Sequence, residues 1–341
     1  ETYLRHLVRY RSVTGNKLQC DAIINYVLHS LPVVAKSKRY ECNGVKSLVV
    51  ALNEKSLKKA TLCFHAHLDV VDGSNAQFQL KKTGDFYTGR GVYDMKGSAA
   101  VFLSLLNYYA QIKQYPDVQF LFTTDEEAGG SNGTQFVLSQ GIKSRFVITG
   151  EPTNLKIGTQ AKGAIWVKVR TKGIPAHGAY LMNGKNAVVE LIKKMKTILS
   201  LNTNTKKGIT VNLSWIKSDN AIANKVPDST EAMLDIRYFS QREMILDVLN
   251  SIKDVNTDFD IDLDAEPVIC SQNNKYLQTL MSIVKKENKD NDPTIKCLGG
   301  SDLGYFAKVG IPGVEYGLSG IGHHSTDERL NISSLDVYFN T

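Results

Sequence analysis

The chain has 341 residues, a length that suggests two domains, or one large and one smaller. Its residues are 42% hydrophobic and 22% charged, a balance typical of a globular protein. No run approaches the roughly 18 apolar residues of a membrane helix, which argues against a membrane protein. The net charge of +7 comes from lysines spread among glutamates and asparagines. This pattern indicates a solvated surface rather than a nucleic-acid binding site. The positive net charge would also suit an anionic substrate.

The N-terminal residues and the cysteines indicate the cellular compartment of the protein. Residues 1–11 carry three arginines and no apolar block, so we expect no secretory signal. The five cysteines are dispersed and form no Cys-x-x-Cys pair. An odd number of scattered cysteines favours reduced thiols, so we predict a cytoplasmic protein.

In the first half of the chain, short apolar runs bounded by polar turns flank a longer helical run. The predicted strands are 47–52, 61–66, 118–123 and 146–149, and the predicted helix is 96–112. This alternation predicts an α/β sheet with some parallel pairs. Ligands bind beyond the carboxyl ends of strands in such sheets. His67, Glu126 and Glu151 each follow a predicted strand, so we expect them to converge.

The middle of the chain has a different order of elements. The predicted strands are 164–171, 209–216, 231–238 and 259–263, and the predicted helices are 186–201 and 243–253. This β-α-β-β-α-β order is ferredoxin-like. We therefore predict an α/β domain of mixed sheet at 1–162 and 268–341, interrupted by an inserted α+β domain at 163–267. A further helix is predicted at 276–286.

The first motif is His67-Leu68-Asp69, at the end of a predicted strand. An imidazole binds metal through one nitrogen and needs a partner for its other N–H. Positions i and i+2 of a strand share a face, so Asp69 could orient His67. The alternative is a strand-end histidine with a capping aspartate. His65 lies on the same face and is interpreted as a packed histidine.

The second motif is Asp94 in the glycine-flanked turn 89–97, just before the predicted helix. Its carboxylate could bridge two cations through its two oxygens. It could equally cap the helix that begins near Lys96. The local sequence does not choose between these interpretations.

The third motif is a run of three acids, Asp125, Glu126 and Glu127. Adjacent carboxylates repel one another unless cations or protons compensate. In a functional interpretation one glutamate binds metal and the other accepts a proton from an activated water. The alternative is a solvated acidic turn.

Two further loops complete the candidate set. Glu151 ends a strand in Gly150-Glu151-Pro152, and a second imidazole comes from His323 or His324 in the glycine-rich loop 320–328. Without Asp125, the motifs together offer two imidazoles and five carboxylates, namely Asp69, Asp94, Glu126, Glu127 and Glu151. One metal ion needs fewer ligands, whereas two metals and a general base need about this many.

Taken in chain order, these motifs resemble the M20 metallopeptidases and deacylases. The resemblance rests on His-x-Asp, Gly-Arg-Gly-x-x-Asp-Met-Lys-Gly, Asp-Glu-Glu, Gly-Glu-Pro-Thr and His-x-x-Asp-Glu, and it spans nearly the whole chain. The ordered set of five motifs is far more specific to the family than any single motif. Residues 132–134, 150–153 and 177–180 look most like the branch of succinyl-diaminopimelate desuccinylases, which lies beside the acetylornithine deacetylases.

The resemblance implies a site with two divalent metals. His67 and Glu151 would bind one metal, Glu127 and His324 the other, and Asp94 would bridge them. Mixed nitrogen and oxygen ligands favour zinc, with cobalt or manganese as substitutes. The family also implies a cis peptide bond after Asp94.

The resemblance assigns Glu126 as the general base and Asp69 as the residue that orients His67. The inserted domain would be a lid that commonly forms a homodimer, and His177 would reach the neighbouring active site and stabilise the oxyanion. Asn224 and Arg237 match lid positions that contact substrate.

Other candidate substrate contacts depart from the desuccinylase pattern. That pattern has two adjacent arginines where this chain has Gln160-Ala161-Lys162-Gly163, and Gly299-Gly300-Ser301-Asp302 differs by one residue. Lys162 and Arg237 would suit a substrate carboxylate, and Ser301 is a further candidate contact. These differences leave the acyl group open.

The resemblance implies hydrolysis of the amide bond of an N-acyl amino acid or a short peptide. The alternatives are a dipeptidase, carboxypeptidase or aminoacylase with the same metals, or a non-catalytic binding protein on this scaffold. We expect no nucleic-acid partner and no membrane partner.

Overall fold

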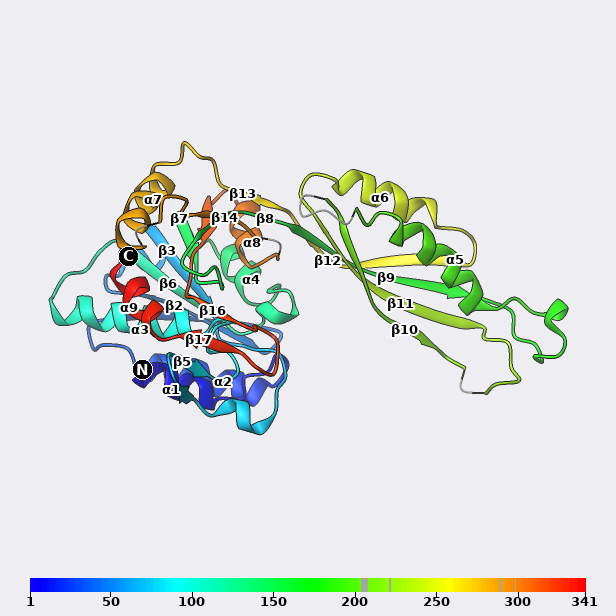
Figure 1. The fold of residues 1–341 in the computed structure, drawn as a ribbon, viewed down its shortest axis with the longest axis horizontal. Helices are drawn as coiled ribbons and strands as arrows, with labels where there is room; N and C mark the ends of the chain where they lie inside the picture. The colour runs from blue at the N-terminus through cyan, green and yellow to red at the C-terminus, as the bar shows by residue number, and fades with distance from the viewer. Residues whose placement is uncertain (204–207, 221, 289, 298) are drawn as a thin grey trace. The chain divides into compact units, whose positions relative to one another are not determined.

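The computed structural model describes residues 1–203, 208–220, 222–288, 290–297 and 299–341. The chain packs into two compact units, which are coloured along the sequence in Figure 1. The first unit comprises Glu1–Gln160, Val268–Cys297 and Ser301–Thr341, and the second comprises Ala161–Pro267 with a short segment that ends at Gly300. Each unit has its own hydrophobic core.

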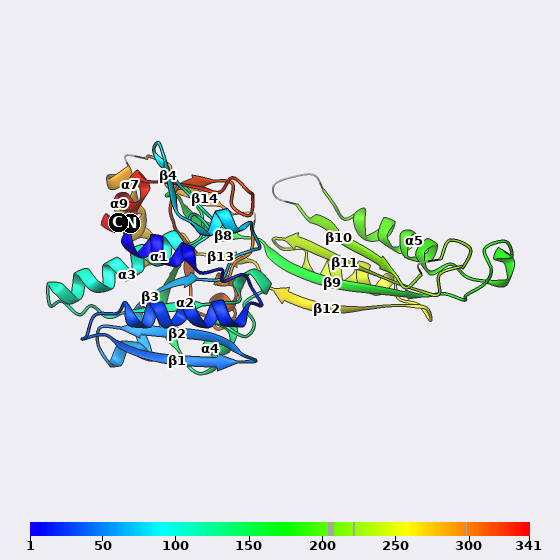
Figure 2. The ribbon, with the colours of Figure 1, turned by 90° about the horizontal axis from the view of Figure 1, so that it is seen from below.

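The first unit is built on a mixed sheet, whose strands are seen from two sides in Figures 1 and 2. In the described part of the chain its order is β1-β2-β6-β3-β7-β15-β8-β13, with β14 beside β8. The strands are β1 Lys36–Cys42, β2 Val45–Ala51, β3 Lys59–His67, β6 Val118–Thr123, β7 Lys143–Thr149, β8 Ile157–Ala161, β13 Val268–Ile269, β14 Thr294–Lys296 and β15 Gly313–Glu315. Strands β6, β3, β7 and β15 are parallel neighbours, whereas β1 and β2 are antiparallel. The predicted mixed α/β sheet is therefore confirmed.

Helices cover both faces of this sheet. The alternation of side chains along β3 shows it: the Phe64 ring lies 5.0 Å from that of Phe102 in α3, and the next side chain, His65, lies 5.8 Å from the Phe306 ring in α8. The core on the Phe64 face includes residues of α1 Thr2–Arg9, α2 Lys17–His29, α3 Lys96–Gln111, α7 Lys275–Asn288 and α9 Ser333–Asn340. The opposite face carries α4 Thr134–Ser139 and α8 Leu303–Lys308.

A second, small sheet brings distant loops of the first unit together. Its order is β16-β17-β5-β4, and its strands are β4 Lys81–Thr83, β5 Phe86–Thr88, β16 Gly320–Ile321 and β17 Arg329–Asn331. Arg329 pairs with Thr88. This pairing places the loop that precedes α3 beside the loop that carries His324.

The second unit has the predicted β-α-β-β-α-β order. Its elements are β9 Gly163–Lys172, α5 Ala187–Leu199, β10 Thr210–Ser218, β11 Ser229–Tyr238, α6 Arg242–Ser251 and β12 Thr257–Ala265. The antiparallel sheet has the order β10-β11-β9-β12, and alternate residues of β9 pack into the core with Leu191 and Leu249 of the two helices. This is the ferredoxin-like arrangement.

Short turns and free thiols complete the description. The 3₁₀ turns are η1 Lys55–Leu57, η2 Asn75–Phe78, η3 Glu126–Ala128 and η4 Leu181–Asn183. All five cysteines, each within the described ranges, are free thiols. Over those same ranges we find no helix with both the length and the apolar character needed to cross a membrane.

Candidate metal centre

The carboxyl ends of three parallel strands meet at one edge of the large sheet. Strand β3 ends at His67, β6 leads into η3 with Glu126 and Glu127, and β7 leads to Glu151. The His67 Nε2 atom lies 3.9 Å from Glu126 Oε2, and the charge of Glu151 acts on His67. The structure thus brings together the three residues that were expected to converge, because parallel neighbours end at the same edge.

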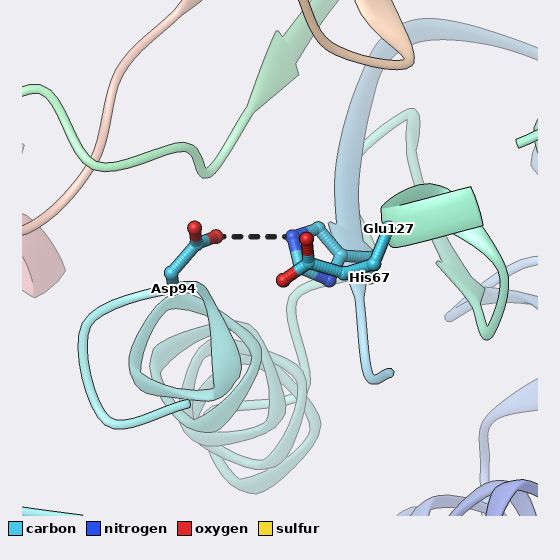
Figure 3. Close-up of side chains that lie close together, drawn as sticks. All are labelled: His67, Asp94 and Glu127. Atoms are coloured by element: carbon cyan, nitrogen blue, oxygen red, sulfur yellow. Dashed lines mark hydrogen bonds and ion pairs between the residues drawn. The ribbon is translucent and has the colours of Figure 1, made fainter. Parts of the chain in front are cut away.

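His67, Asp94 and Glu127 form a group with the geometry of metal ligands. One potential ligand atom from each lies within 4.8 Å of the other two. Figure 3 shows the Asp94 carboxylate, at the start of α3, pointing toward the imidazole of His67, and Asp94 Oδ1 lies 3.1 Å from His67 Nε2. An imidazole with two carboxylates is a ligand set that suits zinc and related divalent metals.

Asp94 lies between two imidazoles. Its Oδ1 faces His67, and its Oδ2 is 3.2 Å from His324 Nε2. His324 Nε2 is also 3.0 Å from Glu127 Oε2. The ring of His323 instead lies edge-on to Tyr93. The structure therefore places His324, rather than His323, at the group, and each oxygen of Asp94 faces a different candidate ligand, as a bridging carboxylate requires.

The peptide bond between Asp94 and Met95 is cis, which confirms the expectation that the resemblance implied. Burial alone would raise the pKa of Asp94, but hydrogen bonds with His324 and His67 bring it well below its usual value. Hydrogen bonds with Asp94 and Glu127 raise the pKa of His324 to about 10. Asp94 and the two imidazoles therefore stabilise the charged forms of one another.

The burial of the two remaining acids, Glu126 and Glu151, bears on whether the site suits positively charged metal ions. Burial raises the pKa of Glu126 well above its usual value, and so does the nearby charge of Glu151, although His67 opposes the rise. Glu151 is shifted in the same direction by burial, and its Oε1 atom is buried without a hydrogen-bond partner among the described residues. Buried carboxylates without partners are costly unless a cation pairs with them. The donor set therefore fits metal ions.

Asp69 contacts the His67 ring mainly through its main chain. His67 Nδ1 lies 3.0 Å from the main-chain oxygen of Asp69 but 3.6 Å from its carboxylate. The carboxylate instead accepts hydrogen bonds from the main-chain N–H groups of Glu126 and Glu127, at 3.2 and 3.1 Å, and from the hydroxyl of Thr14. Strand β3 ends at His67, so the i, i+2 alternation does not extend to Asp69. One residue thereby fixes both the imidazole and the two glutamates.

Buried polar contacts hold the loop behind the two glutamates. The carboxylate of Asp125 accepts hydrogen bonds from the main-chain N–H groups of Asn132 and Gly133, both at 2.9 Å. Asp302, just before α8, accepts a hydrogen bond from Thr134 and lies 3.2 Å from His65 Nε2. His65 is thus a buried, packed histidine, as the sequence analysis interpreted it.

The candidate substrate contacts of the second unit make local interactions. Lys162 is 3% exposed, and its Nζ donates to the Gly208 carbonyl at 2.7 Å. Arg237 pairs with Asp235 at 2.6 Å. His177 Nδ1 accepts a hydrogen bond from its own loop, and Gly178 donates to the Asn224 carbonyl. Their part in binding substrate stays a prediction.

Two buried acids near the site were not predicted. Glu315, at the end of β15, accepts a hydrogen bond from the hydroxyl of Ser301 at 2.7 Å, so Ser301 is engaged within the first unit. Glu328 accepts hydrogen bonds from the loop that carries Asp94. A strand-end position could have indicated Glu315, whereas Glu328 ends the His-x-x-Asp-Glu motif but was given no role of its own.

Comparison with known proteins identifies the family of the chain. Residues 63–341 match peptidase family M20/M25/M40. The chain is 28% identical, over 99% of its length and 95% of the relative, to a succinyl-diaminopimelate desuccinylase of Rickettsia bellii (strain OSU 85-389), and 29% identical, over 99% and 97%, to one of Rickettsia massiliae (strain Mtu5).

Solved structures show the same fold at lower identity. An M20 family metallo-carboxypeptidase from Sulfolobus solfataricus is 17% identical with a TM-score of 0.81, over 99% of this chain and 96% of the other. A tripeptidase from Staphylococcus aureus is 19% identical with a TM-score of 0.78, over 99% and 94%. With the family match covering most of the chain, the conclusion is that this chain belongs to peptidase family M20/M25/M40.

Proposed function

We propose that the chain is a two-metal hydrolase that cleaves the amide bond of an N-acyl amino acid, of the succinyl-diaminopimelate desuccinylase or acetylornithine deacetylase type. The observation that carries the proposal is the position of Asp94, whose two oxygens face His67 and His324 at 3.1 and 3.2 Å. The names of the relatives over nearly their whole length support the deacylase type.

His67 and Glu151 would hold one metal, Glu127 and His324 the other, with Asp94 shared between them. Zinc is the favoured metal, and cobalt or manganese could substitute. Two bound metals would lower the pKa of an attacking water and polarise the substrate carbonyl.

The protein's own part in the reaction falls mainly to Glu126. Its carboxylate lies 3.9 Å from His67 Nε2. Within the described part of the chain, the ion pairs of His324 are with Asp94 and Glu127 and not with Glu126. The Asp69 carboxylate accepts a hydrogen bond from the Glu126 main-chain N–H. Glu126 would accept a proton from the attacking water and return it to the leaving amine. His67 needs a fixed ring to keep Nε2 at the metal, and the Asp69 carbonyl holds its Nδ1 N–H.

We propose the second unit as a lid and a dimerisation domain of a cytoplasmic homodimer. It exposes apolar side chains on the loop before α5 and on α5 itself, namely Tyr180, Leu181, Met182, Val189 and Ile192. Exposed apolar side chains in such number are typical of a contact surface. His177, Asn224, Arg237 and Lys162 would supply oxyanion and substrate contacts from this unit, and Ser301 from the first.

The second candidate is a dipeptidase, a carboxypeptidase or an aminoacylase with the same metals. The shared fold of the Sulfolobus and Staphylococcus structures favours it. The two candidates would share the same metal ligands. They differ in the group on the acyl side of the amide bond that is cleaved.

Removal and return of metal tests the proposal. Metal-free protein is expected to hydrolyse nothing and to bind two equivalents of Zn²⁺ or Co²⁺, with full activity only when both sites are filled. Calorimetric titration gives the stoichiometry, and hydrolysis of an N-acyl amino acid is followed at each point of the titration. A protein that binds fewer than two metals, or that hydrolyses at the same rate without metal, would contradict the two-metal account.

A further inference from the structure

Glu328 lies in the turn between His324 and β17, and its side chain is almost completely buried. Its Oε1 accepts hydrogen bonds from the main-chain N–H groups of Tyr93 and Asp94, at 2.9 and 3.1 Å. Its Oε2 accepts hydrogen bonds from the N–H of Gly91 and from Nη1 of Arg90, both at 2.9 Å. Every donor belongs to the loop that leads into Asp94, which lies 234 positions away in the sequence.

We propose that Glu328 is a positioning residue for the metal centre, whose carboxylate fixes Asp94 in register with His324. The inference rests on the proposed function only in taking these two residues as ligands. Glu328 is four residues from His324, and it binds the N–H of Asp94 itself. A single side chain therefore joins the two loops that would supply the bridging ligand and a terminal ligand.

The hydrogen bonds exclude Glu328 as a further ligand. A carboxylate offers about four lone-pair positions, and the four N–H donors occupy them. The guanidinium of Arg90 balances the buried charge, and its Nη2 donates to the carbonyl of Asp72 at 3.1 Å. No acceptor position is left for a cation, so Glu328 acts through Asp94 rather than on the metal.

Main-chain hydrogen bonds hold part of this loop: the N–H of Arg90 donates to the Gln77 carbonyl at 2.7 Å, and the N–H of Lys96 donates to the Gly91 carbonyl at 2.8 Å. The β17–β5 pairing aligns Arg329 with Thr88, and the N–H of Gly89 lies 3.4 Å from the Glu328 carbonyl. Beyond Gly89, the Glu328 side chain accepts hydrogen bonds from the main chain of the other loop, beside the side-chain contacts of Tyr93 with His323 and of Asp94 with His324. The orientation of the Asp94 carboxylate between the two imidazoles thus depends on these contacts.

The test replaces Glu328 with Gln and compares it with Asp327→Asn. The Gln amide keeps one acceptor oxygen but turns an NH₂ group toward N–H donors, so about half of the contacts are lost. Asp327 is the adjacent acid, exposed and paired with Arg329, and its replacement makes the same change in charge. Partners that orient metal ligands typically contribute about 10–100-fold to affinity, so Glu328→Gln is expected to weaken metal binding by that factor and Asp327→Asn to leave it unchanged.

Two readouts separate positioning from general stability. In metal-free protein, the amides of Gly91, Tyr93 and Asp94 should exchange with solvent faster in Glu328→Gln than in Asp327→Asn, while the amides of β3 and β6 stay protected. In Co²⁺-loaded protein, the visible absorption bands should change in the Gln variant only. If Glu328→Gln does not fold, Glu328→Asp is the second variant, because it keeps the charge and shortens the side chain by one methylene group. It should show smaller changes in amide exchange and in the absorption bands, in the same direction.

Each outcome is informative. Unchanged exchange at residues 91–94, or unchanged metal affinity in a folded variant, would overturn the positioning role. If the wild-type protein binds no metal or hydrolyses no substrate, the proposed function fails, whereas the exchange experiment on metal-free protein still shows whether Glu328 orders the Asp94 loop. The failure of one proposal is therefore distinguishable from the failure of the other.

Discussion

Glu126→Gln is expected to keep its full complement of metal and to lose turnover by about 10²–10⁴-fold, the usual contribution of a general acid–base group. The substitution preserves the size of the side chain. The hydrogen bond from the Glu126 main-chain N–H to the Asp69 carboxylate does not involve the Glu126 side chain, so it should remain. An amide cannot accept the proton of the attacking water at neutral pH. The loss should therefore appear in kcat, measured with an N-acyl amino acid on metal-replete protein.

The neighbouring acid provides the matched control. Glu127→Gln makes the same chemical change one residue along the chain, but it removes a carboxylate that lies 3.0 Å from His324. We expect this variant to lose metal as well as turnover. Near-normal turnover in Glu126→Gln, or loss of metal in Glu126→Gln with metal retained in Glu127→Gln, would show that the two roles have been assigned wrongly.

Asp94→Asn is expected to have the largest effect on metal content. An amide presents one oxygen and one NH₂ group, so it cannot face both His67 and His324 with anionic oxygens. Loss of a partner that merely orients a ligand costs about 10–100-fold in affinity, and loss of the bridge should cost at least about 10²-fold. Metal analysis after dialysis should find fewer than two metals per chain, with turnover lost in parallel.

Asp336→Asn serves as the control for this variant. Asp336 is an exposed acid on α9, so the same change in charge should leave metal content and turnover unaltered. Two metals retained in Asp94→Asn after dialysis would remove Asp94 from the bridging position.

Much of the site could be predicted from the sequence because strand ends are marked locally. His67, Glu126 and Glu151 follow short apolar runs, and parallel strands bring their carboxyl ends to one edge. The choice between His323 and His324 was open on local grounds, and it depended on the spacing within the family motif. In the structure the deciding feature is a contact with Asp94 and Glu127, which no local pattern encodes.

Other features depend on contacts that a linear sequence does not display. Glu328 binds a loop 234 positions away, and the His-x-x-Asp-Glu motif that it ends does not show which groups its carboxylate contacts. The prediction for Asp69 assumed that β3 continues beyond His67, whereas the strand ends there. The N-terminal helices α1 and α2, of 8 and 13 residues, were not predicted, and their stability comes mainly from packing against the core of the first unit.

The most direct test of the central claim is hydrolysis of a panel of substrates by the protein loaded with two metals. The panel contains succinyl-diaminopimelate, acetylornithine and dipeptides, and each reaction is repeated with a chelator. We expect the N-acyl amino acids to be cleaved with a higher kcat/KM than any dipeptide, and the chelator to abolish cleavage. Faster cleavage of dipeptides would make the protein a peptidase, and no cleavage of any member by fully loaded protein would contradict the enzymatic account.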